Sequence, residues 1–446
     1  MALKALDIFK LLPKTNCKEC GCPTCLAFAM KLAQKQASLD DCPTASDDAK
    51  AQLEGAAAPP IQLVTIGAGP KKVQVGNETV MFRHDETFHH PPGIGTIIPD
   101  NLDDAALTER VAAAGKLQFH RVGTDIGITV VGVENVSGDS ATFAATVERV
   151  KTLGLPMVLM AQGADQVAAA LGVCADERPL IHAATADTCD AFAALAAEKT
   201  CPLVVSADTL EGLAELTEKA KAAGVEELMM TLTGASTPGE LDALTSARQL
   251  ATRKGMRSLG YPCLVTSTDE DVYRNVGKAS TFVAKYAGVV LTSLYQPEHI
   301  LPLLTVSQNI YTDPRKPIQV EPKLYEVGAV TPESPLLFTT NFSLTYYTVE
   351  GEVEASRVPA YIGVIDTEGT SVLTAFAADK LTSGEVAEFL NSETVTSKVS
   401  HKKVIIPGYV SVMSGAIKED SGWEVLVGPR EASGISKYLK TVWPAA

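Results

Sequence analysis

The sequence predicts an α/β protein built from three consecutive parts: a small helical unit, a central barrel of eight parallel strands, and a C-terminal α/β domain with a parallel sheet. Three observations predict this organisation. Five of the nine cysteines fall between Cys17 and Cys42. Apolar runs of strand length then alternate with helical patterns as far as about residue 315. The proline-rich segment Asp313–Pro335, expected to be a linker, precedes a second and shorter series of strands and helices.

The first part, residues 1–57, is predicted to place a cysteine-rich loop between two helices. Apolar residues recur at helical spacing in Ala2–Leu12 and in Cys25–Gln36. Small residues and a proline pair at Gly55–Pro60 are typical of a linker. We therefore expect a small separate unit that can move relative to the rest of the chain.

The second part, residues 58–318, begins with a predicted hairpin and continues with eight short apolar runs, as expected of strands buried on both faces. Amphipathic helices such as Ser140–Thr152 and Thr209–Ala223 separate them. Eight strand–helix units over about 240 residues are typical of a TIM (β/α)8 barrel, with a doubly wound open sheet as the alternative. The predicted strands are Thr79–Phe82, Gly127–Val133, Pro156–Ala161, Pro179–Ala184, Pro202–Ala207, Glu227–Leu232, Pro262–Ser267 and Gly288–Ser293.

Composition excludes several classes of function. The 446 residues carry a formal net charge of −15, so neither nucleic acid nor an anionic membrane is expected as a main partner. No run of about 18 apolar residues is present, and the first residues lack the apolar core and cleavage site of a signal peptide. We expect a cytoplasmic protein without a membrane span.

The clustered cysteines have the spacing C-x2-C-x4-C, from Cys17 through Cys20 to Cys25, followed by Cys42 and Pro43. Four thiolates at such spacing fit a [4Fe–4S] or [2Fe–2S] cluster. Structural zinc uses the same ligands, although its usual second C-x2-C pair is missing, and free thiols are the third possibility. The fifth cysteine, Cys22, is expected to point away as a spare thiol, because a four-iron cube takes four protein ligands.

The third part, residues 319–446, has four predicted strands whose carboxyl ends are polar and rich in glycine. In doubly wound sheets, ligands bind at these ends. Neither a GxGxxG nor a Walker A motif is present, so NAD and ATP are poor candidates. The strands are expected at Leu336–Thr340, Ala360–Asp366, Lys403–Gly408 and Glu424–Pro429, and the helices at Val372–Phe389 with a break near Thr382, at Val412–Lys418 and at Gly434–Val442.

Over essentially its full length, the chain resembles the large subunit of the corrinoid iron–sulfur protein of the acetyl-CoA (Wood–Ljungdahl) pathway. The resemblance lies in KTNCKECGCPTCLAFAMKLA near the start, with Cys42-Pro43 after it, and in PLLFTTNFSLTYY, IGVIDTEGTSVLTAFAADK and KVIIPGYVSVMSGAIKE near the end. It implies an iron–sulfur domain, a TIM barrel and a Rossmann- or flavodoxin-like domain that binds a cobamide. One residue departs from the family pattern: where this chain has Cys22, we expect a residue other than cysteine in relatives.

The resemblance also implies two cofactors and their residues. Cys17, Cys20, Cys25 and Cys42 would hold a [4Fe–4S] cluster. Thr374, near the lower face of the corrinoid, is the candidate catalytic residue. The corrinoid contacts it implies are Thr340, Thr345, Tyr346, Thr370, Ser371, Val372, Leu373, Thr374, Gly408, Ser411, Gly428, Pro429, Arg430, Glu431, Ala432 and Ser433.

By the same resemblance, the chain is a methyl carrier in a corrinoid-dependent methyltransferase system. It would pair with a small subunit, accept methyl from methyltetrahydrofolate through a methyltransferase, and deliver it to acetyl-CoA synthase/CO dehydrogenase. A reductive activator and the cluster would restore oxidised cobalt. No D-x-H-x-x-G motif is present, and His401 lies in SHKKV, so we expect a base-off cobamide without a histidine ligand. The alternatives are an electron-transfer activator of another corrinoid protein, and a methyltransferase with a pterin site near His182, Asp208 and Asp269.

Overall fold

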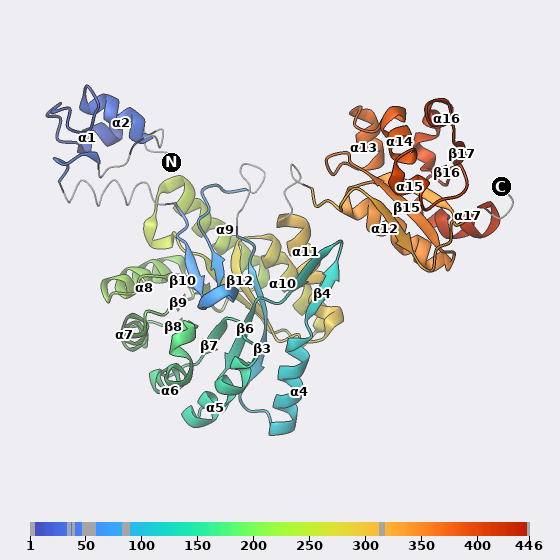
Figure 1. Cartoon of the computed structure of the whole chain (residues 1–446). Helices are drawn as coiled ribbons and strands as arrows, with labels where there is room; N and C mark the ends of the chain where they lie inside the picture. Colours follow the sequence, from blue (N-terminus) through green and yellow to red (C-terminus); the bar gives the residue numbers. More distant parts are fainter. Residues whose placement is uncertain are drawn as a thin grey trace. The chain divides into compact units, whose positions relative to one another are not determined.

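The computed structural model describes residues 5–33, 37, 41–46, 59–82, 90–311 and 317–443 (Figure 1). The chain divides into two compact units. One comprises Met1–Gln118 with Gly127–Tyr311, and the other Phe119–Ile126 with Thr312–Ala446. The predicted boundary between residues 57 and 58 lies outside the described residues.

Two short helices form the cysteine-rich unit, as predicted. Helix α1 spans Ala5–Leu11 and α2 spans Cys25–Ala33. The expected outer ends of both helices, residues 2–4 and 34–36, lie outside the described part of the chain. Ile8 and Leu12 pack against Phe28, which is 1% exposed, and three cysteines complete this small core.

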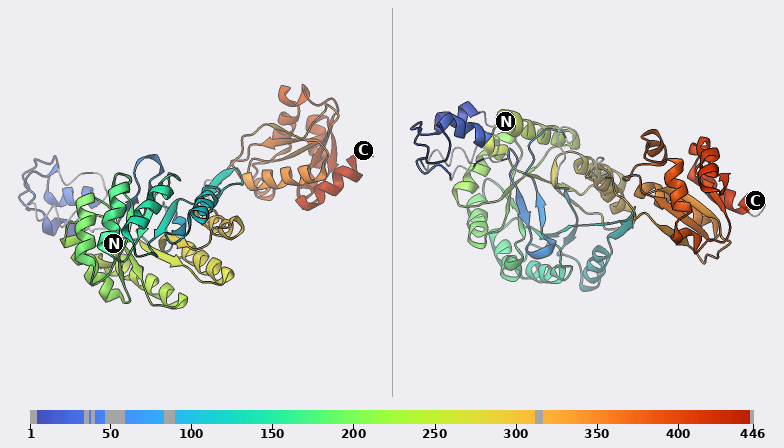
Figure 2. Two further views of the ribbon diagram at one scale, coloured as in Figure 1. Left: turned by 90° about the horizontal axis from the view of Figure 1, so that it is seen from below. Right: turned by 45° about the horizontal axis from the view of Figure 1, so that its top comes forward.

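A closed barrel of eight parallel strands follows, which confirms the predicted fold class. Its strands lie inside a ring of helices (Figure 2). The strand order is β10-β11-β12-β3-β6-β7-β8-β9. The strands are β3 (Gly93–Pro99), β6 (Val130–Glu134), β7 (Met157–Met160), β8 (Leu180–Ala184), β9 (Leu203–Ala207), β10 (Leu228–Leu232), β11 (Cys263–Ser267) and β12 (Ala287–Thr292). The helices are α4 (Asp104–Gly115), α5 (Ser140–Lys151), α6 (Ala164–Cys174), α7 (Cys189–Lys199), α8 (Leu210–Ala222), α9 (Thr237–Lys254), α10 (Val272–Ala284) and α11 (Pro297–Tyr311).

The first barrel strand was predicted in the wrong place. Thr79–Phe82 is not a strand, and β3 at Gly93–Pro99 takes that position between β12 and β6. A Cβ atom at Gly95 would lie 2.3 Å from the carbonyl oxygen of Val130 on the neighbouring strand. The barrel therefore needs glycine at this position. Because glycine has no apolar side chain, it weakens the strand pattern in the sequence, and the strand was missed.

The predicted hairpin is present as the antiparallel strands β1 (Val64–Ile66) and β2 (Val73–Val75). Val64, Ile66 and Val75 pack into the same apolar cluster as the inward-facing barrel residues. Glu227 accepts a hydrogen bond from the Thr65 backbone N–H at 3.1 Å, and Arg178 donates to the Thr65 carbonyl at 3.2 Å. Because Gly67 abuts Pro156, just before β7, the hairpin closes the amino-terminal end of the barrel.

A second hairpin, β4 (Gln118–Arg121) and β5 (Thr124–Gly127), interrupts the chain between α4 and β6. Its central residues group with the C-terminal domain. A Cβ atom on Gly123 would come within 2.7 Å of the Tyr347 ring, and the His120 ring lies 6.3 Å from that ring. No pattern in the sequence pointed to this contact.

The C-terminal domain holds a five-stranded sheet in the order β13-β15-β14-β16-β17. Its strands are β13 (Leu324–Val327), β14 (Leu336–Thr340), β15 (Ala360–Ile365), β16 (Lys403–Ile406) and β17 (Glu424–Val427). The four predicted strands pair parallel, as expected, but a fifth strand that was not predicted, β13, pairs antiparallel with β15 at the edge. β13 also lies in the segment predicted to be a linker. The four parallel strands lie in the order second, first, third, fourth, which is flavodoxin-like.

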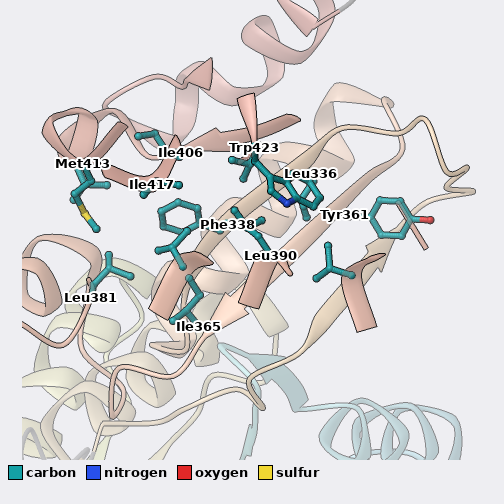
Figure 3. Packing of buried hydrophobic residues seen from close by; sticks show 14 of the residues in the cluster. Leu336, Phe338, Tyr361, Ile365, Leu381, Leu390, Ile406, Met413, Ile417 and Trp423 are labelled. Carbon is teal, nitrogen blue, oxygen red and sulfur yellow. The ribbon is translucent and has the colours of Figure 1, made fainter. Parts of the chain in front are cut away.

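Helices cover both faces of this sheet. On one face, Phe338, Ile365, Leu390, Ile406 and Trp423 form the centre of an apolar core (Figure 3). On the other face, residues of α12 and α17 pack on β14 and β16. The helices are α12 (Ser343–Ser356), α13 (Val372–Ala377), α14 (Ser383–Leu390), α15 (Glu393–Thr396), α16 (Ser414–Ser421) and α17 (Ile435–Thr441). In the described part of the chain, no helix has the length and apolar character needed to cross a membrane.

The predicted break near Thr382 is the start of α14. The Thr382 side chain accepts from the Glu385 backbone N–H, while the Glu385 carboxylate accepts from the Thr382 backbone N–H at 2.9 Å. Thr382→Ala should therefore destabilise this domain by about 1 kcal/mol. Both tryptophans, Trp423 and Trp443, belong to this domain, so fluorescence during urea unfolding measures it selectively.

Thr396→Ala is the matched control for this measurement, because Thr396 is exposed and its hydroxyl only donates to the Ser392 carbonyl one helical turn earlier. Equal unfolding midpoints for the two variants would contradict the capping role of Thr382.

Candidate functional site

An apolar cavity of about 320 Å³ opens at the carboxyl ends of β14 and β16. These two strands are neighbours in the sheet. After β14, the chain forms β15 on one side of it and then returns to form β16 on its other side. Such a reversal of strand order is where open α/β sheets bind ligands. Leu337, Phe338, Ile405 and Ile406 line it from the strands, and Leu344, Val349 and Ile435 from helices α12 and α17.

The structure brings many of the predicted corrinoid contacts to this cavity and leaves others outside its lining. Those that line it are Thr345, Ser371, Val372, Leu373, Gly428, Pro429, Arg430, Glu431 and Ala432. The lining does not include Thr340, Tyr346, Thr370, Thr374, Gly408, Ser411 and Ser433.

Tyr346 is a core residue rather than a rim residue. It is 2% exposed, its hydroxyl donates to Glu350 Oε1 at 2.7 Å, and its ring lies 4.5 Å from that of Tyr325. Burial, reinforced by the Glu350 carboxylate, raises the pKa of Tyr346 well above its ordinary value. Its inward direction on α12 was hidden in the sequence, because a tyrosine can serve a core or a binding site equally well.

Three buried hydroxyls lie where β14 passes into α12. Thr339, Thr340 and Ser343 are 1%, 0% and 1% exposed, and their side-chain oxygens have no hydrogen-bond partner among the described residues. Burying a hydroxyl without a partner is unfavourable. Thr339 also lines the cavity, so a polar group bound there would find a hydrogen-bonding partner.

Asn341 organises the adjoining loop after β15. Its side-chain amide donates to Asp366 Oδ1 at 2.8 Å, and its oxygen accepts from the backbone N–H groups of Thr367 and Gly369 at 3.0 Å each. Sequence inspection missed Asn341, although an asparagine directly after a buried strand is a signal for such a role. The loop it holds presents Ser371 to the cavity.

Thr374, the predicted catalytic residue, is exposed on the first turn of α13. Its hydroxyl lies 3.0 Å from that of Ser371, whose carbonyl accepts from the Ala375 backbone N–H. The pair places two hydroxyls at the rim, one lining the cavity and one beside it.

The loops after β16 and β17 touch through glycine. The Gly408 N–H donates to the Pro429 carbonyl at 3.0 Å, and the Gly428 N–H to the Ile406 carbonyl at 2.9 Å. A Cβ atom on Gly408 would lie 2.6 Å from the Gly428 carbonyl oxygen. Gly408 therefore stays outside the cavity lining but sets how closely two of its walls approach.

The cysteine-rich loop curls tightly. Lys14, Asn16, Lys18 and Gly21 all have left-handed backbone conformations, with φ of 59°, 50°, 69° and 73°. Such turns point backbone N–H groups inward, a feature of many iron–sulfur sites. The Asn16 N–H lies 3.4 Å from the Cys25 sulfur, and the Cys25 N–H donates to Asn16 Oδ1 at 2.8 Å. A hydrogen bond from the Glu19 backbone, with those of two threonine hydroxyls, lowers the pKa of Cys17.

The cysteine sulfurs are gathered incompletely. The Thr44 hydroxyl lies 4.0 Å from the Cys17 sulfur and 3.6 Å from the Cys42 sulfur. Cys25 and Cys42 are buried, Cys20 is half-buried and Cys17 is exposed. Within the described ranges, no three Cys, His, Asp or Glu side chains converge closely enough to hold a metal ion. Cysteine thiols are the donor type that an iron–sulfur cluster uses, so the chemistry of this loop fits such a cluster.

Comparison with known proteins places the chain in a family. A family model for the CO dehydrogenase/acetyl-CoA synthase delta subunit matches residues 63–439. The chain belongs to this family. The corrinoid/iron-sulfur protein large subunit of Moorella thermoacetica is 45% identical, with 99% of each chain covered. The gamma subunit of the acetyl-CoA decarbonylase/synthase complex of Methanothermobacter thermautotrophicus is 36% identical over 98% of this chain and 99% of its own.

Two further similarities concern parts of this family member. A model described as "Putative Fe-S cluster" matches residues 12–44, the span of the five clustered cysteines. The solved dihydropteroate synthase of Thermus thermophilus covers 50% of this chain and 94% of its own length, at 17% identity and a TM-score of 0.38.

His401 lies at the opposite end of the sheet from the cavity, and both of its ring nitrogens have hydrogen-bond partners. Its Nε2 lies 2.8 Å from the Ser334 carbonyl, its Nδ1 accepts from the Lys403 backbone N–H, and its ring packs on Trp443. It precedes β16, whereas the cavity lies after that strand. No histidine is among the described residues that line the cavity.

Three polar residues of the barrel were candidates for a pterin site: His182, Asp208 and Asp269. Asp269 accepts from the Asp271 backbone N–H in the turn before α10, and Asp208 lies in the turn before α8. Burial lowers the pKa of His182 to about 4, so its ring is neutral at pH 7, and its Nε2 has no partner among the described residues.

Proposed function

We propose that this chain is the methyl-carrying large subunit of a corrinoid iron–sulfur protein in the acetyl-CoA pathway, with a cobamide at the C-terminal domain and a [4Fe–4S] cluster in the cysteine-rich unit. The observation that carries the proposal is the apolar cavity where the strand order reverses. Its apolar lining suits an aromatic base, and the polar groups at its rim suit the polar edge of a macrocycle. The corrinoid, when bound, supplies a cobalt that accepts and gives up a methyl group.

The residues of the chain would bind and orient this group. Leu337, Phe338 and Ile405 would offer an apolar wall to the lower base of the cobamide. Thr339 offers an unpartnered hydroxyl within the same cavity. Ser371 and Thr374 would place their hydroxyls at the rim, beside the bound group.

Exposed apolar side chains surround the same edge of the domain. Leu344, Leu373, Phe376, Tyr409 and Val412 are 50%, 48%, 36%, 43% and 76% exposed. An exposed apolar patch of this kind commonly marks a place where a protein or a ligand binds. We propose that the small subunit covers this edge, and that the methyltransferase, acetyl-CoA synthase/CO dehydrogenase and a reductive activator approach the corrinoid in turn.

Uptake of a cobamide by the full-length chain, compared with uptake of cobinamide, tests the cavity. Cobinamide has the corrin but lacks the lower nucleotide. If the base occupies the cavity, cobinamide should bind about 100-fold more weakly, since a buried aromatic base contributes about 2–3 kcal/mol. Visible absorption of the bound corrinoid measures both affinities.

EPR of the cobalt(II) form is the second readout of this experiment. We expect no nitrogen superhyperfine splitting, because neither the base nor a histidine would coordinate cobalt. Equal affinity for the two corrinoids, or a nitrogen signal, would contradict the base-off proposal.

The alternative, an electron-transfer activator of another corrinoid protein, predicts iron without cobalt in the anaerobically purified protein. The carrier predicts about four irons and one corrinoid per chain. We favour the carrier because an activator has no use for the cavity.

A further inference from the structure

Thr339, near the carboxyl end of β14, has a hydroxyl that the chain buries and does not pair. The residue is 1% exposed, and its side-chain oxygen has no hydrogen-bond partner among the described residues. Because side chains alternate along a strand, Thr339 lies on the same sheet face as Leu337, which packs toward α12 and α17. The cavity lies on that face, and Thr339 is part of its lining. Its hydroxyl is therefore directed toward the cavity.

Other polar groups of the lining already have partners. The hydroxyl of Thr348 donates to a carbonyl one turn earlier in α12, and that of Tyr409 pairs with Glu431 at the rim. The charged residues of the described lining, Arg430 and Glu431, both follow β17. On the strands themselves the lining around Thr339 is uncharged, and burying an ionised group there without a counter-charge would be costly. A ligand group that pairs with Thr339 is therefore expected to be neutral.

The lower base of a cobamide supplies such a group in some cobamides and not in others. A benzimidazole or purine base that does not coordinate cobalt keeps a neutral ring nitrogen, which accepts a hydrogen bond as the unprotonated nitrogen of imidazole does. A phenolic base is joined to its ribose through oxygen and has no ring nitrogen. In the cavity, the first class of base would satisfy the Thr339 hydroxyl, whereas the second would cover the hydroxyl with carbon.

We propose that Thr339 determines which cobamides the chain binds: its hydroxyl donates to a ring nitrogen of the lower base, so nitrogen heterocycles are preferred to phenols. The inference rests on the proposed function, because it requires the base to occupy the cavity. A site built to form a hydrogen bond discriminates strongly against an analogue that cannot form it, since the buried partner is then left unpaired.

Affinities of full-length variants for two cobamides test the proposal. One is cobalamin, whose base is dimethylbenzimidazole, and the other carries p-cresol; visible absorption during titration measures both. The two bases also differ in size and in how readily they leave cobalt, so the decisive quantity is the change in the affinity ratio between two chains. Thr339→Val keeps the shape of the side chain and removes the hydroxyl. It should lower the preference for cobalamin by about tenfold or more relative to the wild type.

Thr340→Val is the matched control. Thr340 is 0% exposed and its hydroxyl is also unpartnered among the described residues, but it lies on the opposite face of β14 and outside the cavity lining. This variant should keep the wild-type affinity ratio. In the chain without corrinoid, both substitutions should raise the urea midpoint reported by tryptophan fluorescence, because each removes a buried hydroxyl that has no partner. A lower midpoint for Thr339→Val would show that its hydroxyl is paired within the chain and would overturn the proposal.

The affinity ratios separate the remaining outcomes. If Thr339→Val binds both cobamides with the wild-type ratio, the cobamide site stands and the role of Thr339 is overturned. An equal fall of the ratio in Thr340→Val would overturn that role as well. A wild-type chain that binds neither cobamide would overturn the proposed function together with the inference that rests on it, so the two failures are distinguishable.

Discussion

Gly408→Val is expected to abolish cobamide binding by a folded chain. The new side chain would begin 2.6 Å from the Gly428 carbonyl oxygen, 2.7 Å from the Pro429 carbonyl carbon and 2.8 Å from the Arg430 nitrogen. All three are backbone atoms, so the loop after β17 must move as a whole and take the wall that it forms in the cavity with it. We expect affinity to fall by about 100-fold or more, a cost of about 3 kcal/mol, measured by corrinoid absorption during titration.

Gly415→Ala serves as the control for that experiment. Gly415 lies in α16, and a Cβ atom there would meet nothing within 4 Å. This variant should bind as the wild type does and be slightly more stable, because alanine favours a helix over glycine. Tryptophan fluorescence shows whether each variant is folded. Wild-type affinity in a folded Gly408→Val chain would contradict the proposed position of the corrinoid.

Arg248→Ala should destabilise the barrel strongly. Arg248, on α9, is 5% exposed at its side chain and pairs with Glu78 at 2.6 Å. It also donates from Nε and Nη2 to the Val80 carbonyl at 3.1 and 2.9 Å. The substitution leaves the Glu78 carboxylate, whose side chain is only 14% exposed, without its counter-charge, and breaking a largely buried pair typically costs about 3–5 kcal/mol. The barrel holds no tryptophan, so circular dichroism or hydrogen exchange of barrel amides must measure the loss.

Arg149→Ala provides the comparison for this prediction. Arg149 and Asp104 form an ion pair of similar length, 2.7 Å, but their side chains are 45% and 86% exposed. Water screens such a pair, and its removal should cost about 0–1 kcal/mol. If the two variants lost the same stability, burial would not be the source of the Arg248 effect.

The barrel could be predicted from sequence because most of its strands are short apolar runs, which can be recognised without knowing which strands pair. Strands β7 to β12 lie within one or two residues of their predicted positions. The first strand failed, because a close approach of two backbones requires glycine at Gly95, and glycine weakens the apolar signal. The β13 strand failed for a related reason, since prolines on both sides made Leu324–Val327 look like linker.

The candidate site was predicted less completely. The loops that meet at the cavity were identified because they follow buried strands, and parallel strands bring such loops together. Which side chains line the cavity depends on the direction in which each side chain points. For residues that follow a strand, the position of the strand alone does not define this direction. Hence Tyr346 turned out to be a core residue, and the organising role of Asn341 was missed. Cys22 is buried with Cys25 and Cys42, and a ligand count by itself says nothing about where a fifth thiol packs.

The hairpin of β4 and β5 makes the C-terminal domain discontinuous in the sequence, because Phe119–Ile126 belongs to it while the rest begins near residue 312. On the ribosome, this piece emerges before most of the barrel and long before α12, whose Tyr347 it contacts. The segment must stay available, with Gly123 free to meet Tyr347, until α12 has been made. A truncated chain that starts at residue 319 would contain the cavity but would lack this piece of its own folding unit.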